Sequence, residues 1–263
     1  MTPPIFTPDG AEVEEVILPD GSEASEVIAP DGTVVFEGDT IPDSVVNHMT
    51  HWYPVDEGAG AELFETLSGD ERDQDIEGAT WETNANRWDG VYLSYDSDYT
   101  VSQTQYGLNS SQVSAVLWFK FNEVGDFDQG VIGATDNNDL DGPSNGWHLV
   151  DRDNSDITLM HADSGATNSV ATISNIDDDT WYFAGISIDG NSASFHLWDE
   201  NDHVADNSGS ADRGQTSDAL LVTGRRGGFT RFLSGGVDAH AVNANTDLDK
   251  ADFTEIWEDT KPE

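Results

Sequence analysis

Residues 180–199, TWYFAGISIDGNSASFHLWD, decide the fold. Along 181–188 the residues alternate so that both faces of an extended segment carry apolar side chains. Asp189-Gly190 is a strong two-residue turn signal because both positions tolerate positive φ, and a second alternating run follows at 193–198. The pattern predicts a β-hairpin that needs cover on at least one face, and therefore a β-sandwich.

The charge of the chain indicates the solvent in which it works. Its 263 residues include 52 Asp and Glu against 10 Lys and Arg, a formal net charge of −42. At an ionic strength of about 1 M the Debye length is about 3 Å, so repulsion among surface carboxylates is largely screened. Because 36% of the residues are hydrophobic and there are 8 Trp, 11 Phe and 6 Tyr, residues 50–258 can still bury a core. The composition predicts a folded, halophilic protein.

The same composition excludes several kinds of partner. An acidic surface lacks the basic footprint that nucleic acid requires, and it disfavours anionic lipid heads. We therefore expect no nucleic-acid partner and no membrane insertion. The chain has no cysteine, and its start, MTPPIFTPDG, has neither the basic nor the apolar region of a secretion signal. This start predicts a chain that is not addressed for export.

The first 49 residues differ from the rest. Pro-Asp-Gly recurs at 8–10, 19–21 and 30–32, and each copy borders a short β-rich run. Such small units do not bury a core alone, so we predict that residues 1–49 are an acidic β-repeat segment for anchoring or oligomerisation. A flexible acidic arm is the alternative. Residues 41–50 are predicted to be a linker.

Residues 50–263 alternate short apolar runs with Gly, Asn and Asp turns, without long helical periodicity. The runs predicted as strands are 51–55, 91–95, 99–103, 113–121, 130–134, 146–151, 156–161, 169–174, 181–188, 193–198, 219–224 and 235–242. One amphipathic helix is predicted over 247–258. Many short strands without alternating helices indicate an antiparallel two-sheet sandwich or jelly roll.

Several motifs follow one another in the order of a known family. WYPVDEGAGAELFETLSG at 52–69 resembles its opening strand and turn, and VSAVLWFKF at 113–121 resembles a core strand. DDDTWYFAGISIDGNSASFHLWDEN at 177–201 resembles its hairpin, and GGVDAHAV at 235–242 resembles its closing strand. Together they resemble the laminin-G-like, concanavalin-A-like jelly-roll superfamily, as in surface or fibre proteins of haloarchaeal viruses. The resemblance implies an all-β jelly-roll sandwich and a binding role.

Calcium is the one cofactor that the sequence suggests. Ca²⁺ takes six to eight oxygen ligands, and the acidic loop DNNDLDG offers Asp136, Asp139 and Asp141. The resemblance adds Glu57 and Asp238, which it places where the first and last strands meet. The alternative is that these carboxylates only belong to the acidic surface of a halophilic protein.

Aromatic side chains at loop ends and a basic cluster are the candidate ligand-binding residues. Trp and Tyr can stack on the apolar faces of sugars while their polar atoms stay hydrated, and arginines can pair with an acidic sugar. The candidates are Trp88, Tyr92, Tyr99, Trp147, Arg225 and Arg226. The alternatives are core positions for the aromatic residues and structural pairing with carboxylates for the arginines.

ERDQDIE at 71–77 is the stretch that suggests catalysis. Its alternating acids would place carboxyls on one face of a strand, and glycosidases use two carboxyls about 5–10 Å apart. Its flanks are Gly-Asp and Gly-Ala, however, whereas a buried catalytic strand has apolar flanks. We therefore predict a protein that is not an enzyme and has no catalytic residues.

These observations favour a non-enzymatic virion surface protein of a virus that infects a halophilic archaeon, such as a tail fibre, head spike or decoration protein. It would be assembled in the host cytoplasm and would bind a host surface glycan or glycoprotein, in the manner of a lectin, for attachment. Its other partners would be virion proteins and itself, as a homo-oligomer such as a trimer. The alternatives are an extracellular carbohydrate-binding module or adhesin of a halophilic cell, and a purely structural capsid decoration protein.

Overall fold

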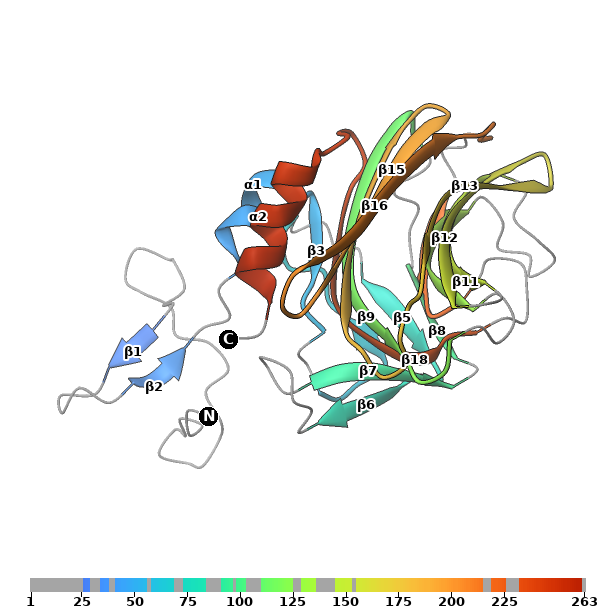
Figure 1. The fold of residues 1–263 in the computed structure, drawn as a ribbon. Coiled ribbons are helices and arrows are strands. Elements are labelled where there is room, and N and C mark those ends of the chain that lie inside the picture. The colour runs from blue at the N-terminus through green and yellow to red at the C-terminus, as the bar shows by residue number, and fades with distance from the viewer. Residues whose placement is uncertain are drawn as a thin grey trace. The chain divides into compact units, whose positions relative to one another are not determined.

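The computed structural model divides into two compact units, Met1–Pro42 and Asp43–Glu263. The residues that it describes are 26–28, 34–37, 41–55, 58–68, 73–83, 91–96, 98–102, 110–124, 129–135, 145–152, 155–214, 219–225 and 232–261 (Figure 1). The boundary between the two units lies before residue 43, whereas the sequence predicts a domain boundary after residue 49.

The first unit contains a pair of strands. In it, β1 (Glu26–Ile28) pairs with β2 (Val34–Glu37) in antiparallel register. The Pro-Asp-Gly copy at 30–32 falls between them, so this repeat unit forms the β structure that its sequence predicts. The copies at 8–10 and 19–21 lie outside the described residues.

The second unit is built on two antiparallel sheets. The first, called here the β12 sheet, has the strand order β13-β12-β11-β10-β17-β8-β5-β4. Its strands are β4 (Glu62–Leu63), β5 (Gln74–Glu77), β8 (Tyr99–Ser102), β10 (Gly130–Thr135), β11 (Gly146–Arg152), β12 (Asp156–Asp163), β13 (Ala166–Ser174) and β17 (Leu220–Thr223). The second, called the β14 sheet, has the order β16-β15-β14-β9-β18-β7-β6, with β3 pairing with β18. Its strands are β3 (His51–Tyr53), β6 (Thr80–Thr83), β7 (Val91–Asp96), β9 (Gln112–Phe121), β14 (Tyr182–Asp189), β15 (Ser192–Asp199), β16 (His203–Ser210) and β18 (Ser234–Asn243).

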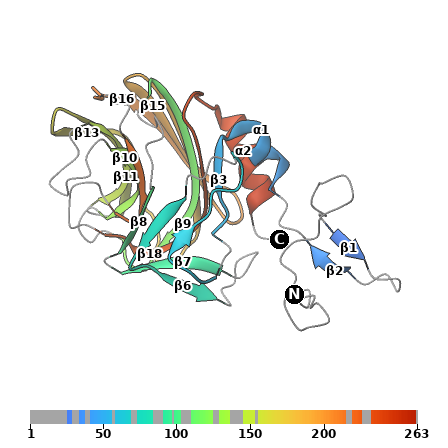
Figure 2. The same cartoon turned by 180° about the vertical axis from the view of Figure 1, so that it is seen from behind.

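The two sheets face each other across one apolar core (Figures 1 and 2). The β14 sheet contributes Phe119 and Ile186 to it, and the β12 sheet contributes Leu149 and Leu159, all with 0% of their surface exposed. The prediction of an all-β, antiparallel two-sheet sandwich is therefore confirmed.

The hairpin at 180–199 takes the form that its sequence predicts. β14 and β15 pair over their full length, from Tyr182 opposite Asp199 to Asp189 opposite Ser192. Gly190 in the turn has φ 60°, which its lack of a side chain permits. Every residue from 182 to 188 is buried, so β14 is covered on both faces.

A C-terminal helix covers the outer face of β14. This helix, α2 (Lys250–Thr260), begins at the N-cap Asp249, close to the predicted start at 247. It buries Phe253 and Trp257 against the sheet, and the indole N–H of Trp118 on β9 donates a hydrogen bond to Thr260 Oγ1 at 3.0 Å. Helix α2 thus covers the outer face of the β14 sheet over β14 and β9.

A short helix, α1 (Asp43–His48), packs beside α2 (Figure 1). His48 Nε2 lies 3.3 Å from Glu255 Oε2 of α2. The prediction of a linker at 41–50 is therefore wrong for most of its length, because tertiary contact stabilises a helix too short to show periodicity. Neither of the helices described has the length and apolarity needed to cross a membrane.

The edge strands β13 and β16 close one side of the sandwich. Asn207 Nδ2 on β16 donates to the carbonyl oxygen of Thr172 on β13 at 2.6 Å. At Gly209 the two strands approach so closely that a Cβ would lie 2.1 Å from the carbonyl oxygen of Val170. Contacts between sheets, as well as within them, thus hold these edges together.

The buried carboxylate of Glu65 connects the segment after β4 to β3 by hydrogen bonds. Glu65 Oε1 accepts hydrogen bonds from the N–H groups of Trp52 at 3.1 Å, Leu67 at 2.8 Å and Ser68 at 3.0 Å. Burial alone would raise the pKa of Glu65, but the neighbouring His51 and the donated hydrogen bonds outweigh it and lower the pKa from 4.5 to about 2. The side chain is therefore held as an anion.

Gly185 allows α2 to lie against the sheet. A Cβ at this position would lie 2.6 Å from Phe253 Cγ, which is closer than two non-bonded carbon atoms can approach. Phe253 is itself fully buried, so its ring has little room to move away.

We expect Gly185→Ala to lower the free energy of unfolding by about 1–3 kcal/mol, because it overpacks the contact between β14 and α2. Ser187→Ala, on the same face of the same strand, is the control and should change it by less than about 0.5 kcal/mol. Urea unfolding in about 2 M KCl measures both. Equal stability of the two variants would show that α2 does not pack as described.

Glu65→Gln should weaken a stabilisation that depends on pH. Because the folded state lowers the pKa of Glu65, its contribution is complete above pH 4.5 and is lost as the pH falls through about 2. We expect the free energy of unfolding to fall with acidification more steeply in the wild type than in the variant. At neutral pH the variant should be less stable by about 1–3 kcal/mol, since buried donors lose a charged acceptor.

The same measurement on Glu77→Gln, which alters an exposed acid on β5, controls for the general effect of removing one negative charge. A wild type and a Glu65→Gln variant with parallel pH dependence would contradict the assignment.

Candidate functional site

The structure describes five of the residues proposed to bind a ligand or a metal. These five are Tyr92, Tyr99, Trp147, Arg225 and Asp238. The other six, which lie outside the described residues, are Glu57, Trp88, Asp136, Asp139, Asp141 and Arg226. For these six, ligand and calcium binding stay predictions.

Trp147 is not available to a ligand. It lies on β11 opposite Ala134 and His161, its side chain is 0% exposed, and it belongs to the core between the sheets. The prediction of a sugar-stacking role for Trp147 is therefore wrong. Its position on β11 points the indole into the core, which is the alternative that the sequence analysis gives for the aromatic candidates.

Asp238 is a buried residue of β18. It is 0% exposed, and its Oδ1 accepts the N–H of Ala239 at 2.8 Å. Within the described part of the chain, no three His, Asp or Glu side chains gather closely enough to hold a metal ion. Calcium binding at Asp238 therefore stays a prediction, and its proposed partner Glu57 lies outside the described residues.

Tyr99 and Arg225 do come together, at a position where the arginine is buried and the tyrosine is half-buried. The guanidinium carbon of Arg225 lies 4.7 Å from the ring centre of Tyr99 and 5.8 Å from that of Phe232. Arg225 is only 6% exposed. A buried cation packed against rings in this way stabilises the fold. The role is structural, but the contact is with rings, whereas the sequence predicts pairing with carboxylates as the alternative to ligand binding.

Tyr92 forms a partly exposed aromatic cluster with Trp181, which the sequence predicts only as part of the hairpin. Its ring meets that of Trp181 edge to face, with centroids 5.3 Å apart. Lys120 Nζ lies 4.9 Å from the centroid of Tyr92 and 5.5 Å from that of Trp181. All three side chains are partly exposed. We call these three residues the aromatic platform.

A glycine makes room for this platform. A Cβ at Gly236 on β18 would lie 2.7 Å from the ring of Tyr92 and 3.1 Å from that of Trp181. The two rings therefore pack directly on the backbone of β18, on the outer face of the β14 sheet. Because Gly236, Lys120 and Trp181 come from distant parts of the chain, no local pattern in the sequence indicates the cluster.

Lys120 differs from the other lysines. Lys250 Nζ lies 2.7 Å from Asp206 Oδ2, and Lys261 Nζ pairs with Glu258. Among the described residues, no carboxylate lies within ion-pair distance of Lys120, and its ammonium group lies over the two rings. In a chain with a net charge of −42, this lysine can offer its charge to an outside anion.

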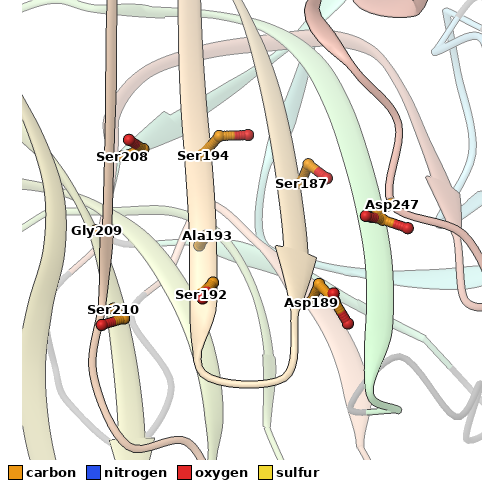
Figure 3. A pocket seen from close by; sticks show the side chains of 9 residues that line it. All are labelled: Ser187, Asp189, Ser192, Ala193, Ser194, Ser208, Gly209, Ser210 and Asp247. Atoms are coloured by element: carbon orange, nitrogen blue, oxygen red, sulfur yellow. The ribbon is translucent and has the colours of Figure 1, made fainter.

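A second candidate site lies at the turn end of the β14–β15 hairpin (Figure 3). It is a shallow depression of about 500 Å³, which we call the serine groove. Its lining residues are Ser187, Asp189, Ser192, Ala193, Ser194, Ser208, Gly209, Ser210 and Asp247. Cross-strand register produces it, because Ser187 faces Ser194 and Ser194 faces Ser208 on three neighbouring strands.

A cluster centred on Asp206 borders the serine groove. Asp206 Oδ1 lies 2.7 Å from both His196 Nδ1 and His203 Nε2, and Oδ2 accepts a bond from Lys250 Nζ at 2.7 Å. Burial would raise the pKa of Asp206, but these three partners outweigh it and hold the pKa well below its usual range. The cluster ties β15 and β16 to the start of α2.

No family model and no curated protein matches the chain. Among solved structures, domain 4 of AbnA, a GH43 extracellular arabinanase from Geobacillus stearothermophilus, solved in complex with arabinotriose, is similar with a TM-score of 0.58. The two share 16% sequence identity, and the match covers 79% of this chain and 97% of that one.

Two toxin domains are similar as well. The botulinum neurotoxin serotype D binding domain matches with a TM-score of 0.56 and 14% identity, over 82% of this chain and 53% of that one. The binding domain of Paraclostridial Mosquitocidal Protein 1 matches with a TM-score of 0.58 and 12% identity, over 81% and 52%. The chain thus spans about half the length of these toxin domains, and at such identities the similarity is one of fold.

Proposed function

We propose that the sandwich is a carbohydrate-binding module and that the aromatic platform is its binding site. The observation that carries the proposal is the contact of Tyr92, Trp181 and Lys120 on an open part of the outer face. Aromatic rings present apolar area to the C–H faces of a sugar. The fold gives background support, because similar structures include a domain solved with arabinotriose and the binding domain of a botulinum neurotoxin.

Lys120 favours a sugar that carries a negative charge. Its ammonium group is held above two rings and has no carboxylate partner among the described residues. A uronate or sulfate group would supply that partner while the sugar ring stacks on Trp181. The acidic surroundings oppose such binding at low ionic strength, so the site is suited to concentrated salt.

The wider setting that we propose is the virion surface of a virus of a halophilic archaeon, as a tail fibre, head spike or decoration protein. The net charge of −42 supports the halophilic part, and the periodic N-terminal segment supports anchoring and self-association. Binding to a host glycan or glycoprotein would then gain strength from several copies. A cellular carbohydrate-binding module or adhesin, and a structural decoration protein without a ligand, are the competing proposals.

Binding to a panel of neutral, uronate-bearing and sulfated glycans in about 2 M KCl tests the site. We expect Trp181→Ala to weaken binding about tenfold or more, since stacking on one aromatic ring is lost. Lys120→Gln should weaken binding to charged glycans and spare neutral ones. Phe64→Ala removes a ring that is 47% exposed elsewhere on the unit and should leave binding unchanged.

The proposal fails if the folded wild type binds no glycan in the panel, or if Trp181→Ala and Phe64→Ala bind as the wild type does. Equal loss on neutral and charged glycans with Lys120→Gln would remove the charge specificity but keep the carbohydrate site.

The anchoring role of the first unit is tested by a chain that begins at Asp43, which keeps α1 on the sandwich. We expect the full chain to be a stable homo-oligomer in concentrated KCl and the shortened chain to be a monomer of unchanged β content. Light scattering after chromatography measures both masses. A full chain that is already monomeric would contradict the role.

A further inference from the structure

We propose that Ser194 is an activated nucleophile, with His196 as its general base, and that the serine groove hydrolyses small uncharged esters. This activity is separate from carbohydrate binding at the aromatic platform and uses none of its residues.

Three side chains form a continuous chain of hydrogen bonds at the edge of the groove. His196 Nε2 lies 3.2 Å from Ser194 Oγ, and its Nδ1 lies 2.7 Å from Asp206 Oδ1. Nucleophile, base and orienting carboxylate in this sequence of contacts are the features by which a catalytic triad is recognised, whatever the fold.

The carboxylate sets the direction of these bonds. Asp206 also receives bonds from Lys250 and His203, so it is held as an anion and accepts the Nδ1 proton of His196. The lone pair of Nε2 is then left to accept the hydroxyl proton of Ser194. Asp206 is thus a positioning residue, which fixes the tautomer that a general base requires.

Packing holds the imidazole in place. The His196 ring lies between those of Phe253, at a centroid distance of 5.7 Å, and Trp198, at 6.1 Å. Only 12% of the His196 side chain is exposed. A base supported by rigid strands and by α2 keeps its geometry without help from the substrate.

The groove supplies access and hydrogen-bond donors. Ser194 is partly exposed and lines the depression of about 500 Å³ (Figure 3). Ser187 and Ser208 lie directly opposite it on the two neighbouring strands. Within the described residues their hydroxyl groups make no hydrogen bond, so both can donate to the oxyanion that forms when an ester is attacked.

The rim of the groove selects against anions. Asp189 and Asp247 line it, and among the described residues no lysine or arginine does. Their carboxylates oppose a negatively charged substrate at low ionic strength, and concentrated salt screens most of this repulsion without making the groove attractive to anions. The chemistry therefore points to a neutral ester with a small acyl group.

The reaction is balanced with an ester and water. Ser194 Oγ bonds to the acyl carbon and passes its proton to His196 Nε2, and the bond to the alcohol oxygen breaks as that oxygen takes the proton. Water then attacks the acyl group on Ser194, again giving a proton to His196. The carboxylic acid leaves, and the serine hydroxyl regains the proton.

Labelling of the full chain with an alkyl fluorophosphonate in about 2 M KCl is the direct test. Attack by Ser194 forms an O–P bond and expels fluoride. We expect peptide mapping to place the label on Ser194 and not on Ser192 or Ser210 of the same groove. Ser194→Ala should abolish labelling, and Ser174→Ala, an exposed serine of β13 outside the groove, should retain it.

Hydrolysis of p-nitrophenyl acetate gives a second readout. We expect His196→Gln to lower kcat/KM by about 10²-fold or more, and Asp206→Asn to lower kcat with KM unchanged. Circular dichroism and the urea midpoint establish that each variant is folded. An unlabelled but folded wild type, labelling that persists in Ser194→Ala, or label spread evenly over the groove serines would overturn the proposal. Glycan binding by Trp181→Ala has no bearing on it.

Discussion

The burial of β14 on both faces is the constraint on which the rest of the structure depends. Its inner face, with Ala184, Ile186 and Ile188, belongs to the core between the sheets. Its outer face packs Phe183 against Trp118 and Trp198 and places Gly185 against Phe253 of α2. A surface so rich in carboxylates contributes little cohesion of its own, so the stability of the sandwich rests on this central strand and the helix that completes its cover.

Much of this arrangement could be predicted because its signals are local. Alternation and the Asp189-Gly190 turn specify a hairpin without reference to the rest of the chain. β16 gave no such signal, since HVADNSGS has few apolar residues and pairing with β15 imposes its strand conformation. α1 was missed for a similar reason, because packing against α2 stabilises it. Trp147 shows the limit of alternation, which distinguishes two faces and does not say which of them is interior.

The candidate sites depend on register, which the sequence does not show. Ser194 and His196 are visibly two residues apart on one strand face, but the approach of Asp206 requires β16 to pair with β15 through the irregularity near Trp198. Similarly, Tyr92 was predicted as a binding residue, whereas its partners Trp181 and Lys120 come from strands that meet only in the folded sheet. The sequence thus shows which side chains could bind or react, but it does not show which of them the fold brings together.

The contact between the edge strands β13 and β16 determines where the sandwich unfolds locally. With those edges joined by Asn207 and by the close approach at Gly209, the strands that end the two sheets on the opposite side are the short β4 and β6. Local unfolding follows the weakest boundary. We therefore expect local unfolding of the sandwich to begin at β4 and β6. Among the four edge strands, the amide hydrogens of β13 and β16 should exchange with solvent last.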